Sequence, residues 1–243
     1  MQIETLVIAT HNAKKGGEMV TILSSALPET RILTLADFPG ATEPEETGTT
    51  YQENAIIKAV SAFHDTGMTC LADDAGLEID AMGGEPGLYS KRFAGEDTPF
   101  SEKMAIILDR LEGIESRAAR FRCCIALASP LRGSSVVRQF GGSVPDVVAY
   151  VHDSSEIQRF LPNPRTPELA HRLTEPSILT IEATCEGQIA LEPSGNGGFG
   201  YDPIFFIPEL NCTMADLTAD QKHQISHRGK VLRALCQYLS ASG

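Results

Sequence analysis

Two adjacent acids, Asp73 and Asp74, are the residues most suggestive of chemistry in this sequence. They follow a short apolar run over residues 68–72, which predicts a β-strand, and Gly76 comes soon after them. Neighbouring carboxylates repel each other, so the end of a buried strand suits them only if a positive group, such as a divalent cation, lies nearby. Because Asp and Gly are also ordinary turn residues, a surface turn is the competing interpretation.

Lys14 and Lys15 provide positive charge near the N-terminus. They belong to a polar loop between a predicted strand over residues 3–10 and a helical pattern over residues 18–27. The N-terminus of such a helix presents free backbone N–H groups to an anion, and the lysines add to that attraction. The glycine spacing of a P-loop is absent. A capped helix with solvated lysines explains the same pattern equally well.

A second helix is predicted over residues 51–64, with Thr49 or Thr50 as its cap. Asn54 and Lys58 are four residues apart and share one face of it. An acidic loop over residues 43–50 precedes the helix. The alternative for both features is a charged surface exposed to solvent.

The C-terminal half contains a glycine-dense loop over residues 195–203, followed by a strand pattern over residues 204–207. Closely spaced glycines indicate that the backbone approaches a ligand or another segment, although a wide turn is the simpler alternative. Ser226 is expected to cap the last helix, which places His227 and Arg228 in its first turn. A cation there opposes the helix dipole unless an anion or an acceptor lies nearby.

The remaining pattern is that of a mixed α/β protein. Strands are expected over residues 31–35, 118–128 and 178–184, and a helix begins near Pro99. Residues 1–243 are interpreted as a single domain with an irregular, proline-containing insertion at about residues 130–180. Within it we expect a hairpin strand at residues 136–140 and short helices at residues 156–161 and near residue 169.

Composition limits the partners of the chain. With 20 Lys and Arg against 32 Asp and Glu, the formal charge is −12, which argues against a nucleic-acid polymer or an anionic membrane as partner. A small phosphorylated ligand remains compatible with a few local cations and a metal. The six cysteines form no C-x-x-C pair and suggest a reducing cytoplasmic setting. No apolar run approaches the roughly 20 residues that span a bilayer.

Seven short motifs, in this order, resemble the inosine triphosphate pyrophosphatase family, whose members hydrolyse deaminated purine nucleoside triphosphates. The resemblance covers nearly the whole chain outside residues 130–180. Each motif alone is weak, whereas all of them in register are specific. They are Thr10-x-Asn12-x-x-Lys15, Glu46-Thr47-Gly48, Glu53-Asn54-Ala55-x-x-Lys58, Asp73-Asp74-x-Gly76-Leu77, Pro86-Gly87-x-Tyr89-Ser90-x-Arg92, Gly198-Phe199-Gly200-Tyr201-Asp202-Pro203 and Ser226-His227-Arg228-Gly229.

The resemblance implies one α/β domain with an elongated, twisted mixed sheet, two lobes flanking a central active-site cleft, and a homodimer. It implies hydrolysis of ITP, dITP and XTP to the monophosphate and pyrophosphate with Mg²⁺. Asp74 would be the general base and a metal ligand, and Glu46 (or its neighbour Glu45) and Asp73 would assist the metal and the water. Lys15 and Lys58 would hold phosphate oxygens. The other substrate-binding positions would be Thr10, His11, Asn12, Ala13, Lys14, Ala75, Arg92, Phe199, Gly200, Tyr201, Asp202, Lys222, His227 and Arg228.

The chemistry agrees with these assignments. Carboxylates hold a hard cation through oxygen, and lysines neutralise phosphoryl oxygens. Deamination turns the amino donor at purine C6 into a carbonyl acceptor, which suits donors such as Lys222, His227 and Arg228. Phe199 could stack on the base. One departure is Ala75, where many members have Ser. Two alternatives stay open: a catalytically silent nucleotide-binding or sensor protein, and a pyrophosphohydrolase for a different modified nucleotide.

Overall fold

A computed structural model describes residues 3–130, 147–152, 154–157 and 176–241. The chain divides into two compact units. Unit 1 contains Met1–Asp74, Cys124–Ala183 and Val231–Gly243, and unit 2 contains Ala75–Cys123 and Thr184–Lys230. The strands of the described residues form one mixed sheet in the order β2-β1-β3-β4-β6-β7-β8, with β5 paired to β6. This confirms the predicted α/β class with a mixed sheet.

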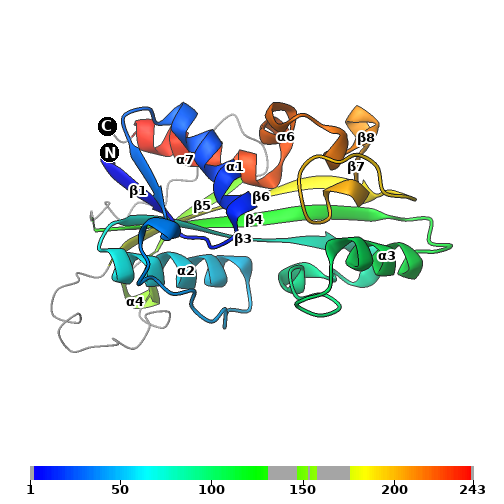
Figure 1. The fold of residues 1–243 in the computed structure, drawn as a ribbon, viewed down its shortest axis with the longest axis horizontal. Coiled ribbons are helices and arrows are strands. Elements are labelled where there is room, and N and C mark those ends of the chain that lie inside the picture. The colour runs from blue at the N-terminus through cyan, green and yellow to red at the C-terminus, as the bar shows by residue number, and fades with distance from the viewer. Residues whose placement is uncertain (1–2, 131–146, 153, 158–175, 242–243) are drawn as a thin grey trace. The chain divides into compact units, whose positions relative to one another are not determined.

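Unit 1 is built on parallel strands. β1 (Thr5–Ile8) pairs with β2 (Arg31–Thr34) on one side and with β3 (Thr69–Ile79) on the other. Helices α1 (Ala13–Ala26) and α7 (His227–Ala241) lie on one side of these strands, and α2 (Tyr51–Thr66) lies on the other (Figure 1). Because both faces are covered, the strand interior is apolar: Leu6, Val7 and Ile8 are fully buried.

Helix α2 shows why these sequences form these elements. Thr50 is the N-cap, and its hydroxyl accepts a hydrogen bond from Glu53 N–H at 3.1 Å. Gly67 ends the helix in the left-handed region, with φ 69°, which favours glycine. The buried face includes Ala55, Ala59 and Phe63, as the helical spacing predicted.

Unit 2 is held by its own hydrophobic core. It includes the first part of β4 (Ala118–Ser129), the end of β6 (Ser177–Ile189), β7 (Phe205–Ile207) and β8 (Cys212–Thr213). Helices α3 (Phe100–Arg110) and α6 (Ala219–Ile225) complete it. The core packs Leu77 and Ile79 of β3 against Ile107, Phe121 and residues of β7.

Most predicted elements are confirmed, and the differences have physical causes. α1 begins at Ala13, five residues earlier than predicted, because Asn12 caps it. The prediction that the strand ends at the paired acids is wrong, because β3 continues through them to Ile79. Leu77 and Ile79 are fully buried, and this apolar surface extends the strand.

The region expected to be an insertion contributes β5 (Val147–His152) and α4 (Ser154–Ile157) to the described structure. β5 pairs antiparallel with β6. The predicted strand at residues 136–140 and the helix near residue 169 lie outside the described residues. None of the helices in the described part of the chain has the length and apolar character needed to cross a membrane.

Candidate active site

The polar loop after β1 and the paired acids of β3 lie at one edge of the parallel strands of unit 1. β1 ends at Ile8, which pairs with Leu71, so the carboxyl end of β1 lies beside Asp73 and Asp74 in the middle of β3. Ligands of α/β sheets commonly bind beyond the carboxyl ends of such strands. The Ala9 N–H donates to the carbonyl of Leu71 at 2.8 Å, which keeps the two chains paired as far as the loop that follows β1. This edge therefore holds both the polar loop that leads into α1 and the pair Asp73 and Asp74.

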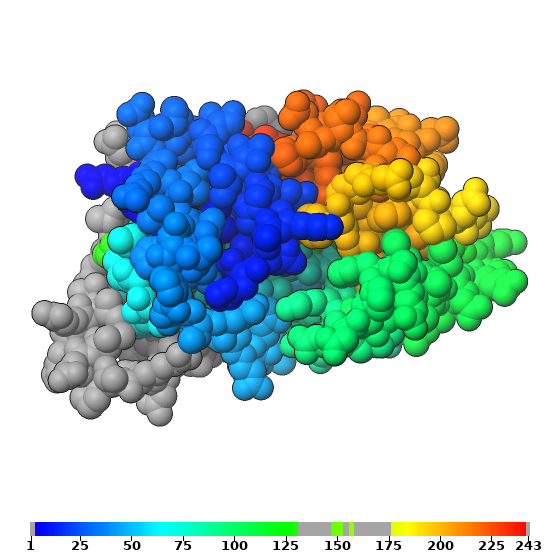
Figure 2. Space-filling model, in the orientation of Figure 1, coloured from blue at the N-terminus to red at the C-terminus, as the bar shows by residue number. Residues whose placement is uncertain are grey.

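Asn12 organises the start of α1. Its Oδ1 accepts hydrogen bonds from the N–H groups of Lys14 and Lys15, both at 3.1 Å. These two N–H groups are therefore engaged by the cap. Lys14 and Lys15 supply the positive charge of this segment, and anion binding there stays a prediction. In Figure 2, the face of unit 1 that is visible includes this N-terminal segment at the surface.

Asp73 and Asp74 form ion pairs with different lysines. Lys15 Nζ lies 3.4 Å from Asp73 Oδ2, and Lys58 Nζ lies 2.9 Å from Asp74 Oδ1. Consecutive residues of a strand point to opposite faces, and α1 and α2 lie on opposite sides of the sheet (Figure 1). Asp73 and Asp74 therefore contact different lysines, on opposite faces of the sheet. The surface turn is excluded, since Asp73 is 2% and Asp74 is 8% exposed.

Lys58 is the centre of a charge cluster on the α2 side. Besides Asp74, its ammonium contacts Glu46 Oε1 at 3.0 Å, so one cation serves two carboxylates. Burial alone would lower the pKa of Lys58, but the charges of Asp74, Asp73 and Glu46 outweigh it and raise that pKa. Burial raises the pKa of Asp74, while the positive charge of Lys58 opposes the shift. A raised pKa makes an ionised carboxylate a stronger proton acceptor, which suits the general-base role expected of Asp74.

The structure also identifies Asn54, which the sequence placed in a motif without a role. It is 2% exposed, accepts a hydrogen bond from Gly48 N–H at 2.8 Å and donates to Asp74 Oδ2 at 3.3 Å. The signal was available, because Asn54 and Lys58 are separated by one helical turn and both face Asp74.

The other predicted positions of unit 1 surround this edge. Thr10 Oγ accepts a hydrogen bond from Asn12 N–H at 3.1 Å. His11, Ala13 and Lys14 are exposed at the start of α1. Of the two glutamates considered as metal ligands, Glu46 reaches Lys58, whereas Glu45 is exposed.

The donor chemistry of Glu46 and Asp74 fits a hard divalent cation. Both are carboxylates, and both already lie within contact distance of one positive group. Within the described ranges, no three His, Cys, Asp or Glu residues gather as a complete metal cage. Two protein carboxylates are nevertheless what Mg²⁺ usually takes, since it keeps waters and binds substrate phosphates at its other positions.

Unit 2 holds a second cluster, in which cations face an aromatic ring. Lys222 Nζ lies 4.7 Å and the Arg228 guanidinium carbon 5.6 Å from the centroid of the Phe199 ring. Lys222 is 5% and Arg228 is 3% exposed, so both cations are desolvated and the attraction to the ring is strengthened.

Asp202 organises this aromatic–cation cluster. Its Oδ2 accepts hydrogen bonds from Phe199 N–H and Lys222 Nζ, both at 2.8 Å. A Cβ on Gly198 would lie 2.0 Å from the same oxygen, and its φ is 66°, so a side chain is excluded there. The glycine-dense loop thus lets the chain close on its own aspartate, which explains why Phe199 is held in place.

The remaining predicted positions of unit 2 are also ordered. Ser226 accepts a hydrogen bond from Gly229 N–H at 3.1 Å, which confirms it as the cap of α7. His227 stacks on Phe121 with ring centroids 4.9 Å apart. The Tyr201 hydroxyl donates to the carbonyl of Ser90 at 2.9 Å.

Three further predicted positions lie in unit 2. Gly200 follows Phe199 with φ 68° and borders the Phe100 ring. Ala75 is half-buried in β3. Arg92 is exposed, and its guanidinium lies 5.9 Å from the centroid of the Tyr89 ring.

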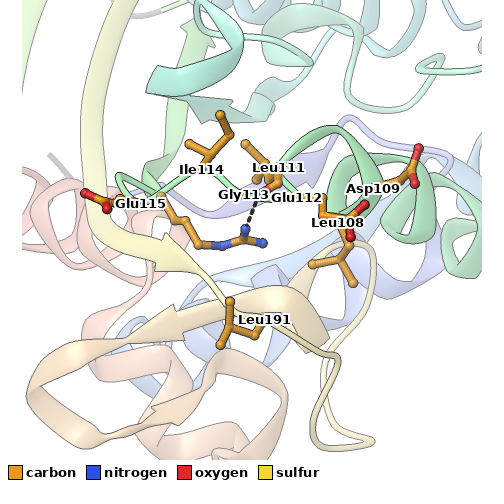
Figure 3. Close-up of a pocket in the computed structure, with 9 residues that line it drawn as sticks. Leu108, Asp109, Leu111, Glu112, Gly113, Ile114, Glu115 and Leu191 are labelled. Carbon is orange, nitrogen blue, oxygen red and sulfur yellow. Dashed lines mark hydrogen bonds between the residues drawn. The ribbon is translucent and has the colours of Figure 1, made fainter.

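A separate hollow of about 460 Å³ opens in unit 2 beside the end of α3 (Figure 3). Arg117 lines it and donates to the backbone carbonyls of Leu111, Ile189 and Ala190. Burial lowers the pKa of this guanidinium. No predicted site residue lines the hollow, and Arg117 uses its donors to hold backbone segments together.

Comparison with known proteins places the chain in a family. The model of the Ham1 family matches residues 6–155 and 168–238. A dITP/XTP pyrophosphatase of Desulforamulus reducens is 39% identical over 237 residues, 97% of this chain and 95% of that protein. The corresponding protein of Geobacillus kaustophilus is 38% identical over 235 residues, 96% and 93% of the two chains.

The fold comparison agrees. The structure of a HAM1 protein from Coxiella burnetii has a TM-score of 0.71 and 34% identity, and 98% of each chain is covered. The Staphylococcus aureus Ham1 protein also has a TM-score of 0.71, with 30% identity over 98% of this chain and all of that chain (100%). The resemblance that the motifs predicted is therefore confirmed, and the chain belongs to the Ham1 family.

Proposed function

We propose that this protein hydrolyses the deaminated purine nucleoside triphosphates ITP, dITP and XTP to the monophosphate and pyrophosphate. The observation that supports the proposal is the cluster of Glu46, Lys58 and Asp74, in which two carboxylates flank one ammonium and both Lys58 and Asp74 are buried. It stands in a chain similar along almost its whole length to proteins named dITP/XTP pyrophosphatase.

The reaction adds water across the anhydride bond between the α and β phosphates. Asp74 takes the proton of the attacking water, because it is a buried carboxylate whose pKa is raised by burial. Lys58 stays protonated, since the surrounding acids raise its pKa, and it offsets the charge of the phosphoryl oxygens together with Lys15. Asp73 holds Lys15, and Asn12 holds the backbone that carries it.

Mg²⁺ is part of the proposal, and Glu46 and Asp74 are the residues that would hold it. When bound, it would acidify water and offset the negative charge that a triphosphate adds to a chain of net charge −12. Chelation of divalent ions is expected to abolish turnover, and readdition of Mg²⁺ to restore it.

The purine is assigned to the aromatic–cation cluster of unit 2. Phe199 offers a ring for stacking, and Lys222 and Arg228 offer donors to a 6-oxo group. Adenine presents an amino donor at that position, so it cannot accept a hydrogen bond from either cation. Burial of both cations makes such a mismatch costly.

The test is a substrate panel measured as pyrophosphate release with Mg²⁺. dITP, ITP and XTP should be turned over at least about 100-fold more efficiently than dATP and ATP, a discrimination within the range of hydrogen-bonding sites. Equal turnover of ITP and ATP would refute the proposed specificity. If a different modified nucleotide were turned over more efficiently than dITP, ITP and XTP, that nucleotide would be assigned as the substrate instead.

Two further properties belong to the proposal. A cytoplasmic setting is supported by six free cysteines, since disulfides are rare there. A homodimer is expected from the family resemblance, and light scattering coupled to size-exclusion chromatography would measure it.

A further inference from the structure

We propose that Asn54 is a positioning residue of this reaction, whose side-chain amide fixes the loop that carries Glu46 relative to the Asp74 carboxylate. The inference rests on the proposed function and adds a residue to it. All of its contacts lie within unit 1.

The first contact holds the loop. Gly48, two residues after Glu46, donates its N–H to Asn54 Oδ1 at 2.8 Å. A Cβ on Gly48 would lie 2.5 Å from that oxygen, so the loop packs directly on the amide. Thr49 continues the attachment, since its N–H and hydroxyl both contact Glu53 Oε2, at 2.7 and 2.8 Å. The acidic loop is therefore fastened to the first turn of α2 immediately after Glu46.

The second contact holds the base. Asn54 Nδ2 donates to Asp74 Oδ2 at 3.3 Å, while Lys58 donates to Asp74 Oδ1 at 2.9 Å. The two carboxylate oxygens are thus bound by two donors, one turn apart on one helix face. Because Gly48 N–H needs an acceptor, the amide oxygen must face the loop and the NH₂ group must face Asp74. One side chain therefore satisfies both partners in a single orientation.

The same helix provides a matched comparison. Gln52 also anchors α2, because its Nε2 donates to Thr180 Oγ at 3.0 Å, but no described contact links it to Asp74 or Glu46. If Asn54 only stabilised the helix, losing either anchor would affect turnover alike. If Asn54 positions the catalytic groups, only its own loss would affect the chemical step.

The experiment compares Asn54→Leu, Asn54→Asp and Gln52→Ala in the full chain, with dITP and Mg²⁺. Asn54→Leu removes both contacts, whereas Asn54→Asp keeps an acceptor for Gly48 and loses the donor to Asp74. Both Asn54 variants should lower kcat by about 10–100-fold, with KM changed far less, as expected for a displaced positioning group. Gln52→Ala should keep the wild-type kcat even where its thermal unfolding midpoint falls as far as that of Asn54→Leu.

Hydrogen exchange of the Gly48 amide gives a readout without substrate. It should become at least about tenfold faster in Asn54→Leu and stay protected in Asn54→Asp, because only the former loses the acceptor. Wild-type kcat in both Asn54 variants, or an equal kcat loss in Gln52→Ala, would overturn the inference. Unchanged Gly48 exchange in Asn54→Leu would also overturn it. A wild-type protein inactive on the whole substrate panel would instead refute the proposed function, and the Gly48 exchange would still decide the structural role.

Discussion

Two buried lysines, Lys58 in unit 1 and Lys222 in unit 2, occupy contrasting surroundings. Lys58 lies between two carboxylates, at 3.0 and 2.9 Å. Lys222 contacts the carboxylate of Asp202 and faces the ring of Phe199. Charge density dominates the first site, whereas a flat apolar surface edged by donors dominates the second. The difference teaches that unit 1 is suited to acid–base and phosphate chemistry, and unit 2 to the recognition of a planar group.

The largest effect is expected for Asp74→Asn. The change keeps the shape of the side chain but removes the proton acceptor, so kcat should fall by about 10²–10⁴-fold for every nucleotide that the enzyme accepts. Steady-state kinetics on dITP and XTP would measure the loss, and circular dichroism would verify the fold. A wild-type kcat in this variant would show that Asp74 is not the base. The assignment of acid–base chemistry to the unit 1 cluster would then be wrong.

The next effect tests whether unit 2 chooses the base. The double variant Asp202→Asn, Lys222→Met removes both charges together, so it avoids the unpaired buried carboxylate that Lys222→Met alone would leave. An asparagine can still accept from Phe199 N–H. The preference for dITP over dATP, measured as the ratio of kcat/KM values, should fall about 10–100-fold, because a charged donor to the 6-oxo group is lost.

Asp202→Asn alone is the control for that experiment. It keeps the Lys222 ammonium and should keep most of the preference. If the double variant discriminates as well as the wild type, Lys222 does not read the base.

A smaller effect is expected for Phe199→Leu. Stacking on an aromatic ring contributes about 1–3 kcal/mol per base, so KM for dITP should rise about tenfold while kcat is retained. Phe100→Leu is the matched control, because that ring packs on Tyr201 and is 39% exposed. A fall in kcat without a change in KM would show that Phe199 affects the chemical step. The separation of chemistry in unit 1 from base recognition in unit 2 would then not hold.

Secondary-structure elements could be predicted from the sequence more fully than side-chain contacts between distant segments. The helical spacing of α2 and the cap of α7 were readable because capping and amphipathic periodicity are local. The extent of β3 was not, because two adjacent acids look like a strand end until the lysines that balance them are known. The stacking of His227 on Phe121 joins distant segments, and no local pattern encodes it.

The site residues show the same limit. Motif order brought Lys15, Lys58 and Asp74 to attention, but only the fold shows that Asp73 and Asp74 use different lysines. Strand alternation could have separated them, had the strand been extended through both. Which of Glu45 and Glu46 contacts Lys58 depends on tertiary packing, and the structure shows that Glu46 does. The assignment of a metal ligand to one of them stays a prediction.

The smallest effect concerns the pH dependence of the unit 1 cluster. Burial raises the pKa of Asp74, the charge of Lys15 lowers it, and the charge of Glu46 raises it. Lys15→Met should therefore move the Asp74 pKa upward, and Glu46→Gln should move it downward. Since the base must be ionised, the acidic limb of kcat/KM against pH should shift in those same directions. Carboxyl ¹³C titration of the protein without Mg²⁺ would measure the pKa directly.

The pH dependence of folding stability tests the same two variants independently of catalysis. The folded pKa of Asp74 lies above its unfolded value, so its contribution to stability is fully present below the unfolded pKa and is lost as pH rises through the folded pKa. Lys15→Met raises the folded pKa further and should enlarge this loss between acidic and neutral pH, whereas Glu46→Gln should reduce it. Denaturant unfolding at a series of pH values would measure both changes. If the pH dependence of the unfolding free energy changed in the same direction in both variants, neighbouring charges would not control the pKa of Asp74. The unit 1 cluster would then differ from the aromatic–cation cluster only in shape.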